Sequence, residues 1–361
     1  YGDLYRNAFV HTRARLYREQ GQPVDVFRTN GGAGLEFAEF EQVNVMAGNT
    51  DVLAQVVAQG QYRQVLVHFL SEAIWQALEP QLAHTRVTVW VHGFEVQAYA
   101  RRAFVYDSDE QHSKARQDSE RRMAFWRRVM QHPSPNLKLV FVSEYLAQCA
   151  MADVGVSLPS SRYVVIHNPI DTDTFRHLPK PATQRTRILS IRPYASRIYA
   201  NDLTVAAILA LSAQPFFHEL EFRLIGDGPL FEQVTAPVQQ FANVILERKF
   251  LTRTEIAALH REYGIFLCPT RMDTQGVSRD EAMASGLVPV TTAVAAVPEF
   301  VDADSGLVVP GEDPQALAQA IIRLYQHPEE FLRLSAGAAA RVRQQSGQQQ
   351  VIAQELMQIR G

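Results

Sequence analysis

The sequence predicts an α/β protein with two Rossmann-like domains. Short apolar runs of strand length alternate with amphipathic runs of helical length along the whole chain, which is typical of parallel sheets covered by helices on both faces. The chain has 361 residues, of which 47% are hydrophobic, so it can supply two separate cores. A proline-punctuated polar segment, Leu178-Pro-Lys-Pro-Ala182, predicts a linker between the halves at about residues 170–185.

Each half contributes six predicted strands. In the first half they are 24–27, 43–46, 65–69, 87–91, 137–142 and 163–166, with helices near 7–20, 51–58, 72–79 and 144–153. In the second half the strands are 188–191, 220–225, 244–246, 265–268, 288–291 and 306–309. Helices are predicted near 202–213, 230–241, 253–263, 278–285, 313–326, 329–344 and 348–358. We therefore expect one domain over residues 1–170, a second over 185–345, and a last helix within 346–361 that crosses back to the first domain.

Composition excludes several classes of protein. The 35 basic and 38 acidic residues give a net charge of −3, which argues against a nucleic-acid binder. The two cysteines, Cys149 and Cys268, both in apolar contexts, indicate a reducing compartment without a disulfide framework. No apolar run reaches the ~18 residues that span a bilayer, and no signal peptide is visible. We expect a cytoplasmic protein. The first residue is Tyr1 rather than Met, so we expect a fragment or a trimmed chain.

The most informative segment follows the apolar run 265–268. Two carboxylates, Asp273 and Glu281, flank Gly276 where a predicted strand passes into a helix that ends at Gly286. Ligands of α/β proteins bind at such junctions. Glycine allows a close backbone approach, and a helix N-terminus attracts anions. The segment therefore predicts a site for a sugar nucleotide, which carries both hydroxyls and phosphates.

A structural interpretation of the same segment stays open. Ser278 and Glu281 have the spacing of a capping box, in which Glu281 reaches back to the backbone N–H of Ser278. Asp273 would then only end a loop.

The segment resembles the acidic-x7-acidic motif of retaining GT-B glycosyltransferases of family 4. The matching residues are Gly276, Glu281, Ala282, Met283, Ala284 and Gly286. Asp273 stands where the family has Glu, and Pro289-Val290 follow one position later than usual. Segments 166–175, 225–230, 297–299 and 306–311 resemble further family motifs in the same order. The family's first strand and Gly-rich loop have no counterpart before the first helix, although Gly2 resembles the end of that loop.

The resemblance implies two Rossmann-like domains facing each other across a cleft, the GT-B fold. It also implies transfer, with retention, of a sugar from a UDP- or GDP-linked donor to a glycan or other glycoconjugate acceptor, as in polysaccharide biosynthesis. No cofactor is implied, and no metal, because the diphosphate is held by protein groups. No metal-ligand spacing such as His-x-x-x-His or Cys-x-x-Cys occurs. The oligomeric state is left open.

Departure of a nucleotide diphosphate places negative charge on the phosphate, so the site needs fixed cations and N–H donors. Arg192 follows the strand 188–191 and matches the family's arginine. Either Arg197 or Tyr199 falls at the family's second cation position. A solvated surface role is the alternative for both arginines.

His92, in His92-Gly-Phe-Glu95, resembles the family histidine near the reacting sugar. A packing or turn role is its alternative. The resemblance assigns Asp273 to hydroxyls of the donor sugar and Glu281 to the ribose. Further donor-binding residues implied are Gly2, Gly226, Gly228, Lys249, Phe250, Gly276, Val277 and Ser278.

The segment 99–131 is rich in arginine and contains Phe125 and Trp126. It suits a helix that contacts a membrane surface or an acceptor, or, as we favour, a solvated face whose aromatics turn to the core. Two other functions are alternatives: a non-catalytic GT-B binding module of a larger protein, and a dinucleotide-dependent enzyme. The second is disfavoured because no Gly-x-Gly-x-x-Gly follows a strand.

Overall fold

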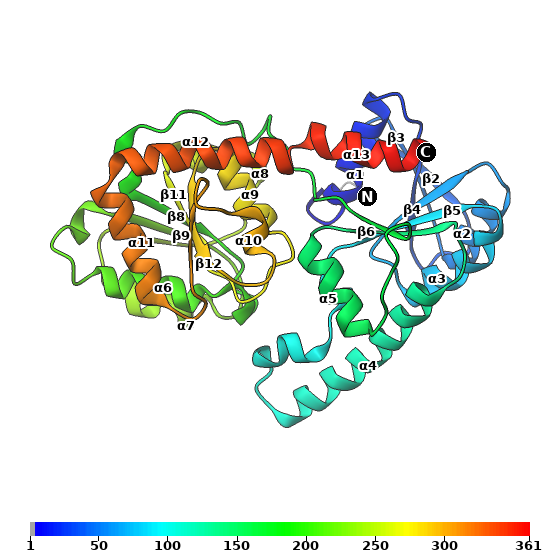
Figure 1. Ribbon diagram of the computed structural model, residues 1–361, viewed down its shortest axis with the longest axis horizontal. Coiled ribbons are helices and arrows are strands. Elements are labelled where there is room, and N and C mark those ends of the chain that lie inside the picture. Colours follow the sequence, from blue (N-terminus) through cyan, green and yellow to red (C-terminus); the bar gives the residue numbers. More distant parts are fainter. Residues whose placement is uncertain (1–3) are drawn as a thin grey trace.

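The computed structural model describes residues 4–361, with side chains from Phe9 onward. Gly2 therefore lies outside the described residues. Two lobes lie side by side, and α12 (Pro328–Gln345) and α13 (Gln348–Arg360) run along one edge from the second lobe to the first (Figure 1). Among residues 4–361, no helix combines the length and the apolar character needed to cross a bilayer.

The first lobe contains two sheets. A parallel sheet has the order β4 (Gln64–His68), β5 (Arg86–Val91), β6 (Leu137–Phe141), β7 (Tyr163–Val165). A smaller sheet has the order β1 (Val26–Thr29), β3 (Val43–Gly48), β2 (Glu36–Phe40). The helices of this lobe are α1 (Leu4–Glu19), α2 (Thr50–Ala58), α3 (Glu72–Leu78), α4 (Asp109–Gln131) and α5 (Glu144–Val154). The largest core cluster lies between the parallel sheet and the helices α2, α3, α4 and α5.

The predicted strands of this lobe are confirmed to within two residues at each end, but β2 was missed. It pairs antiparallel with β3, which corrects the expectation of parallel strands alone. Its sequence, Glu-Phe-Ala-Glu-Phe, is exposed over four of five residues. A strand that buries neither face leaves no run of core residues for the sequence to reveal.

The second lobe is a six-stranded parallel sheet covered by helices. The order is β10 (Val244–Arg248), β9 (Glu221–Gly226), β8 (Arg187–Ile191), β11 (Ile265–Leu267), β12 (Val288–Thr292), β13 (Leu307–Val309). The helices are α6 (Asn201–Leu211), α7 (Phe231–Thr235), α8 (Arg253–Glu262), α9 (Val277–Ala284), α10 (Val297–Phe300) and α11 (Pro314–Gln326), with α12 packed on α9. From β8 the chain runs to β9, and from β11 it runs to β12 on the opposite side, so the strand order reverses between β8 and β11. The loops after these two strands diverge and leave a crevice at their carboxyl ends.

Two helix predictions in this lobe need correction. The helix expected over 230–241 is only α7, followed by a 3-10 turn, Ala236–Val238, that contains Pro237. Proline lacks the N–H that an α-helix would use there, so the α-helix stops. The short helix α10 was not predicted.

Helix α13 closes the first lobe although it follows the helices of the second. Glu355 on α13 is fully buried. It accepts hydrogen bonds from Arg13 Nε at 2.9 Å, Tyr17 Oη at 2.6 Å and Trp90 Nε1 at 3.1 Å. Burial, and next the charge of Glu355, raise the pKa of Tyr17 well above its ordinary value. The last helix thus joins α1 and β5 through one carboxylate.

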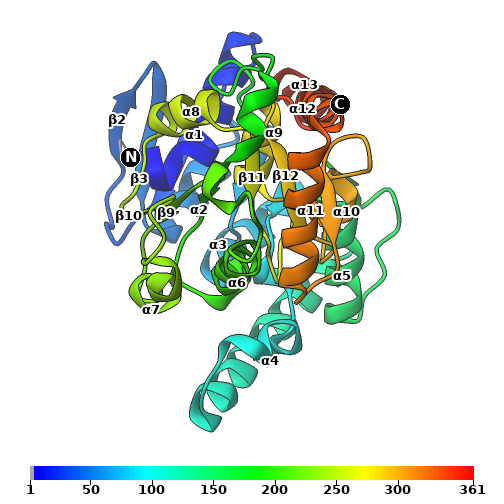
Figure 2. The same cartoon turned by 90° about the vertical axis from the view of Figure 1, so that its left-hand side faces the viewer.

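The charged segment 99–131 forms a 3-10 stretch, Tyr99–Val105, and then α4, which extends away from the body of the molecule (Figure 2). Phe125 and Trp126 are buried in the first-lobe core. The interpretation as a solvated helix with aromatics turned inward holds for these two side chains, which are not available to a membrane surface.

Candidate active site

A pocket of about 410 Å³ lies between loops of the two lobes. It lies where the residues after β5 meet those after β8 and β11, so the crevice of the second sheet forms one of its walls. Seven residues singled out from the sequence line it: His92, Arg192, Tyr199, Asp273, Gly276, Val277 and Ser278.

His92 is paired with a second histidine. His68 ends β4 and His92 follows the neighbouring parallel strand β5, so both lie at the same edge of the sheet. His68 Nδ1 and His92 Nε2 are 3.0 Å apart. Nδ1 of His92 is buried and has no hydrogen-bond partner within the described residues. Burial, and next the charge of Arg13, lower the pKa of His92 to about 3. The imidazole is therefore neutral at physiological pH and can hydrogen-bond a ligand at Nδ1.

The turn after His92 is held by Glu95 and touches the second lobe. Glu95 accepts hydrogen bonds from the N–H of His92 at 2.5 Å and of Gly93 at 2.9 Å. Thr274 Oγ1 donates to the carbonyl of His92 at 2.7 Å. A Cβ on Gly93 would approach Thr274 Cγ2 to 3.2 Å. The small size of Gly93 permits this contact between the lobes.

Arg192 is buried, with 6% of its surface exposed, directly after β8. Its guanidinium lies 5.2 Å from the ring centre of Tyr199, and Nη1 donates to Ser278 Oγ at 3.3 Å. Nε is buried without a partner, and no carboxylate pairs with Arg192 within the described residues. The alternative of a solvated surface arginine is wrong for Arg192. Its unneutralised charge favours an anion in the pocket.

Gly276 directly precedes helix α9 and lines the same pocket as Arg192. It has φ +91, and a Cβ there would lie 2.9 Å from Asp273 Oδ2. Helix α9 starts at Val277, so the N–H groups of its first turn lie at the pocket wall. Ser278 lies inside the helix and does not cap it. The capping-box interpretation of Ser278 and Glu281 is therefore wrong.

Glu281 lies one helical turn further on and does not line this pocket. Arg253 Nη2 is 3.9 Å from Glu281 Oε1 and 3.4 Å from Asp171 Oδ2. Burial raises the pKa of Glu281 from its ordinary 4.5 to about 7, although the charge of Arg253 opposes this shift. The structure thus separates the two acids of the motif: Asp273 faces the pocket, and Glu281 lies among charged groups beside it.

The raised pKa of Glu281 predicts a pH-dependent stability. As pH rises from about 4.5 to 7, the unfolded chain loses this proton while the folded chain still holds it, so stability is lost. Glu281→Gln cannot titrate. We therefore expect the unfolding free energy of the variant to rise relative to wild type by up to about 3 kcal/mol across this window.

Urea denaturation at several pH values measures this difference, and the other titrating groups cancel because both proteins contain them. Glu329→Gln, at an exposed position of α12, is the control. A constant difference between Glu281→Gln and wild type from pH 4.5 to 7.5 would contradict the prediction.

Six predicted residues of the described chain lie outside this pocket: Arg197, Gly226, Gly228, Lys249, Phe250 and Glu281. Arg197 forms an ion pair with Asp107 of the first lobe, whereas Tyr199 lines the pocket. Lys249 pairs with Glu247 at 3.0 Å, and the side chain of Phe250 is 65% exposed. Glu281 has been described. Roles for these residues in donor binding remain predictions.

Gly226 and Gly228 have a packing role between two loops. A Cβ on Gly226 would lie 1.9 Å from the carbonyl oxygen of Arg192, and one on Gly228, which has φ +147, would lie 2.3 Å from the carbonyl carbon of Tyr194. These glycines therefore bring the turn after β9 against the turn that carries Arg192. Direct contact of either glycine with a donor remains a prediction.

The clash at Gly226 predicts a loss of stability. Gly226→Ala forces backbone to move, and we expect it to lower the unfolding free energy by about 1–3 kcal/mol or more. Urea denaturation measures the effect. Gly34→Ala is the control, since no atom lies within 4 Å of a Cβ built there. Wild-type stability of Gly226→Ala would show that the loop moves without cost.

The sequence did not single out Arg102 and Thr274, which line the pocket, or His68, which pairs with His92 behind it. His68 could have been found, because histidines that end adjacent parallel strands meet at one edge. Nothing in the sequence indicated a site role for Thr274 except its position between Asp273 and Gly276. Arg102 lines the pocket from the 3-10 stretch Tyr99–Val105, although the sequence assigned the whole charged segment to a solvated face.

No group of three or more His, Cys, Asp or Glu side chains within residues 4–361 is arranged to hold a metal ion.

Comparison with solved structures identifies the architecture. Sucrose-phosphate synthase from Thermosynechococcus elongatus superposes with a TM-score of 0.75 over 98% of this chain and 92% of that chain, at 16% identity. The chain has the GT-B fold. A glycosyltransferase from Rickettsia africae ESF-5 matches this GT-B chain with a TM-score of 0.71, at 14% identity over 97% of this chain and 93% of that one. Anabaena Alr3699/HepE, solved with UDP and glucose, matches with a TM-score of 0.67, at 13% identity over 98% and 95% of the two chains.

Sequence comparisons agree with this fold over part of the chain. Residues 186–327 match the family model described as Glycosyl transferases group 1. WcaL of Escherichia coli (strain K12), named as a colanic acid biosynthesis glycosyltransferase, is 28% identical over 51% of this chain and 48% of its own length. D-inositol 3-phosphate glycosyltransferase of Streptomyces bingchenggensis (strain BCW-1) is 27% identical over 48% and 42%. The aligned region spans about half the length of these curated relatives.

Proposed function

We propose that this GT-B chain is a glycosyltransferase of the family 4 type. It would move a sugar, with retention, from a UDP- or GDP-linked donor to a glycan or glycoconjugate acceptor. One observation carries the proposal: Arg192, buried without an acidic partner, lies beside the first turn of α9 at the switch point of the second sheet. A diphosphate placed there would meet both a fixed cation and helix N–H groups.

The described residues suit distinct parts of the reaction. Arg192 and the first turn of α9 would stabilise the charge that develops on the leaving phosphate. Asp273 would accept hydrogen bonds from donor-sugar hydroxyls. His92, kept neutral by burial, would hydrogen-bond the sugar through Nδ1 and is not the general base. The leaving phosphate would itself take the acceptor's proton. This mechanism uses no metal.

The comparisons support the part of the proposal that concerns binding of the nucleotide-sugar donor. The matched region 186–327 contains Arg192, Asp273 and α9, and the HepE neighbour was solved with UDP and glucose. The named function of WcaL supports a role in polysaccharide biosynthesis. The acceptor, a cytoplasmic location and contact with the cytoplasmic membrane face remain predictions from the sequence.

A panel of UDP- and GDP-sugars tests the proposal in two steps. Thermal unfolding first identifies the donor, because a ligand at a hundredfold excess over Kd stabilises the native state by about 2.7 kcal/mol. Release of free nucleotide from that donor, with and without candidate acceptors, then measures turnover. Stabilisation without release under any acceptor would favour the non-catalytic binding module. Absence of stabilisation by every donor and by free UDP or GDP would refute nucleotide-sugar binding.

A further inference from the structure

Arg102 brings a second unneutralised cation to the cleft, from the first lobe. Its side chain lines the same pocket as Arg192. The guanidinium lies 4.1 Å from the ring centre of Phe94, and its Nε is buried without a hydrogen-bond partner. Within the described residues no carboxylate pairs with it. Stacking on Phe94 therefore positions the charge and leaves its N–H donors free.

Arg122 of α4 increases the positive charge at this wall. Its guanidinium lies 4.2 Å from the ring centre of the same Phe94, and its Nε is also buried without a partner. Its Nη2 donates to the carbonyl of Gln97 at 2.9 Å. Burial lowers the pKa of Arg102 and of Arg122. Arg102 and Arg122 thus both stack on the ring of Phe94, and neither has a carboxylate hydrogen-bonded to it. A bound anion would stabilise this arrangement.

Neither of the carboxylates that line the pocket, Glu95 and Asp273, forms an ion pair with Arg102. Both oxygens of Glu95 accept from backbone N–H groups, and Asp273 Oδ1 accepts from the N–H of Gln275 at 3.2 Å. Arg197, an expected cation, is paired with Asp107. Among the described residues that line the pocket, Arg102 and Arg192 are the two with a positive charge. Tyr199 lines the same pocket, and the guanidinium of Arg192 lies over its ring.

We propose that Arg102 binds the donor's diphosphate from the first lobe, opposite Arg192, so that the anion bridges the two lobes. This inference rests on the proposed function. It assigns to the first lobe a cation that the sequence placed in the second, at Arg197. It also makes closure of the lobes part of diphosphate binding, because the two arginines belong to different lobes.

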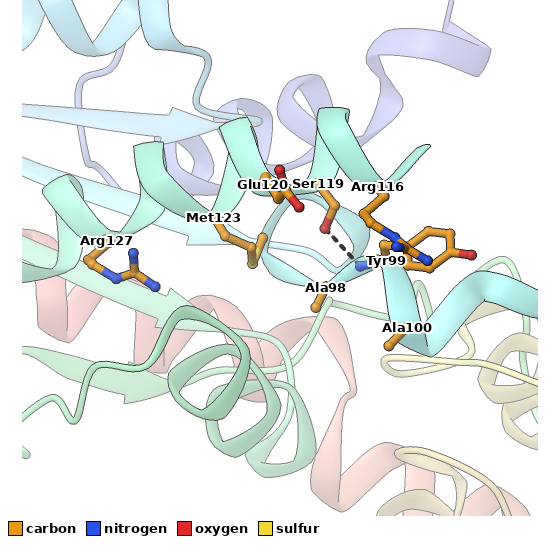
Figure 3. Close-up of a pocket in the computed structure, with 8 residues that line it drawn as sticks. All are labelled: Ala98, Tyr99, Ala100, Arg116, Ser119, Glu120, Met123 and Arg127. Atoms are coloured by element: carbon orange, nitrogen blue, oxygen red, sulfur yellow. Dashed lines mark hydrogen bonds between the residues drawn. The ribbon is translucent and has the colours of Figure 1, made fainter. Parts of the chain in front are cut away.

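A second hollow provides a matched control. It has a volume of about 530 Å³ and is lined in part by Arg116 and Tyr99 (Figure 3). Arg116 belongs to the same charged segment, is exposed, and stacks 5.5 Å from the ring centre of Tyr99. It does not line the cleft pocket. Arg116→Gln therefore removes an equivalent stacked arginine from outside the proposed site.

Calorimetric titration of UDP, GDP and pyrophosphate measures the role of Arg102. We expect Arg102→Gln and Arg102→Met to lower the affinity for the probe that wild type binds by about 10- to 100-fold. This is the effect of losing hydrogen bonds to a charged group. Met keeps an unbranched stem against Phe94 without the charge. Arg102→Lys should retain part of the affinity, and Arg116→Gln all of it. The affinity of wild type should also fall more steeply with NaCl than that of Arg102→Met, which a purely structural role would not produce.

Unchanged affinity of Arg102→Gln or Arg102→Met would overturn the inference. If Arg192→Gln weakens binding in the same experiment while the Arg102 variants do not, the proposed function stands and Arg102 has no part in it. An increase in the acceptor KM alone would also overturn it, since Arg102 would then bind an acceptor anion. If wild type binds none of the three probes, both the inference and the proposed function fail.

Discussion

Replacing Arg192 with alanine is expected to reduce sugar transfer by about 100- to 1,000-fold, the usual cost of removing one preorganised group that stabilises developing negative charge. Arg192 is 6% exposed and has no acidic partner within the described residues, so its charge is available to the leaving phosphate. The measurement is kcat for nucleotide release, with the donor identified by the thermal screen.

The matched variants for Arg192 separate charge from geometry. Arg192→Lys keeps the charge but loses the planar set of donors, so we expect an intermediate rate. Arg323→Ala removes an exposed arginine of α11 that pairs with Glu330, and should leave the rate unchanged. A folded Arg192→Ala protein with wild-type kcat would refute the assignment of Arg192 to the leaving phosphate.

Glu355→Ala is expected to produce the largest loss of stability, about 3–5 kcal/mol. The side chain of Glu355 is fully buried and that of Arg13 is 2% exposed. Removal of the carboxylate leaves the Arg13 charge unpaired in the core and leaves Tyr17 and Trp90 without their acceptor. Both penalties arise from buried polar groups that no longer have partners.

Urea denaturation of Glu355→Ala measures this loss as a change in midpoint. Met357→Ala, two residues away on α13 and 63% exposed, is the control and should change stability little. Arg13→Met combined with Glu355→Leu should restore part of the lost stability, because the unpaired charge is then absent. Wild-type stability of Glu355→Ala would mean that water reaches Arg13.

Much of the fold could be predicted from the sequence because apolar periodicity is a local signal. Nearly all residues of the six strands of the second lobe are buried or half-buried, and each strand was found within two residues of its bounds. The elements missed or misjudged are those that lack a buried face or a full helical run: β2 is exposed, and α7 is cut short before Pro237. The pairing of β2 with β3 could not be inferred from neighbouring residues, whereas Pro237 is a local signal for the early end of α7.

The candidate site was only partly predictable. Strand-end residues such as His92 and Arg192 could be placed, since parallel strands bring their carboxyl ends to one edge. The pairing of His92 with His68 depends on strand register, and the exclusion of Glu281 from the pocket depends on the side chains packed around α9. These are contacts between segments far apart in the chain.

The sequence alone determined the α/β architecture and the position of the Asp273–Gly276 loop at a strand end, because burial patterns and turn residues act over a few positions. Only the tertiary structure decided which arginines reach the cleft. Arg197 turns to Asp107, 90 positions away in the chain, while Arg102 stacks on Phe94 and lines the pocket. The physical reason is that the partner of a charged side chain is set by the packing of the two lobes, which no local pattern encodes.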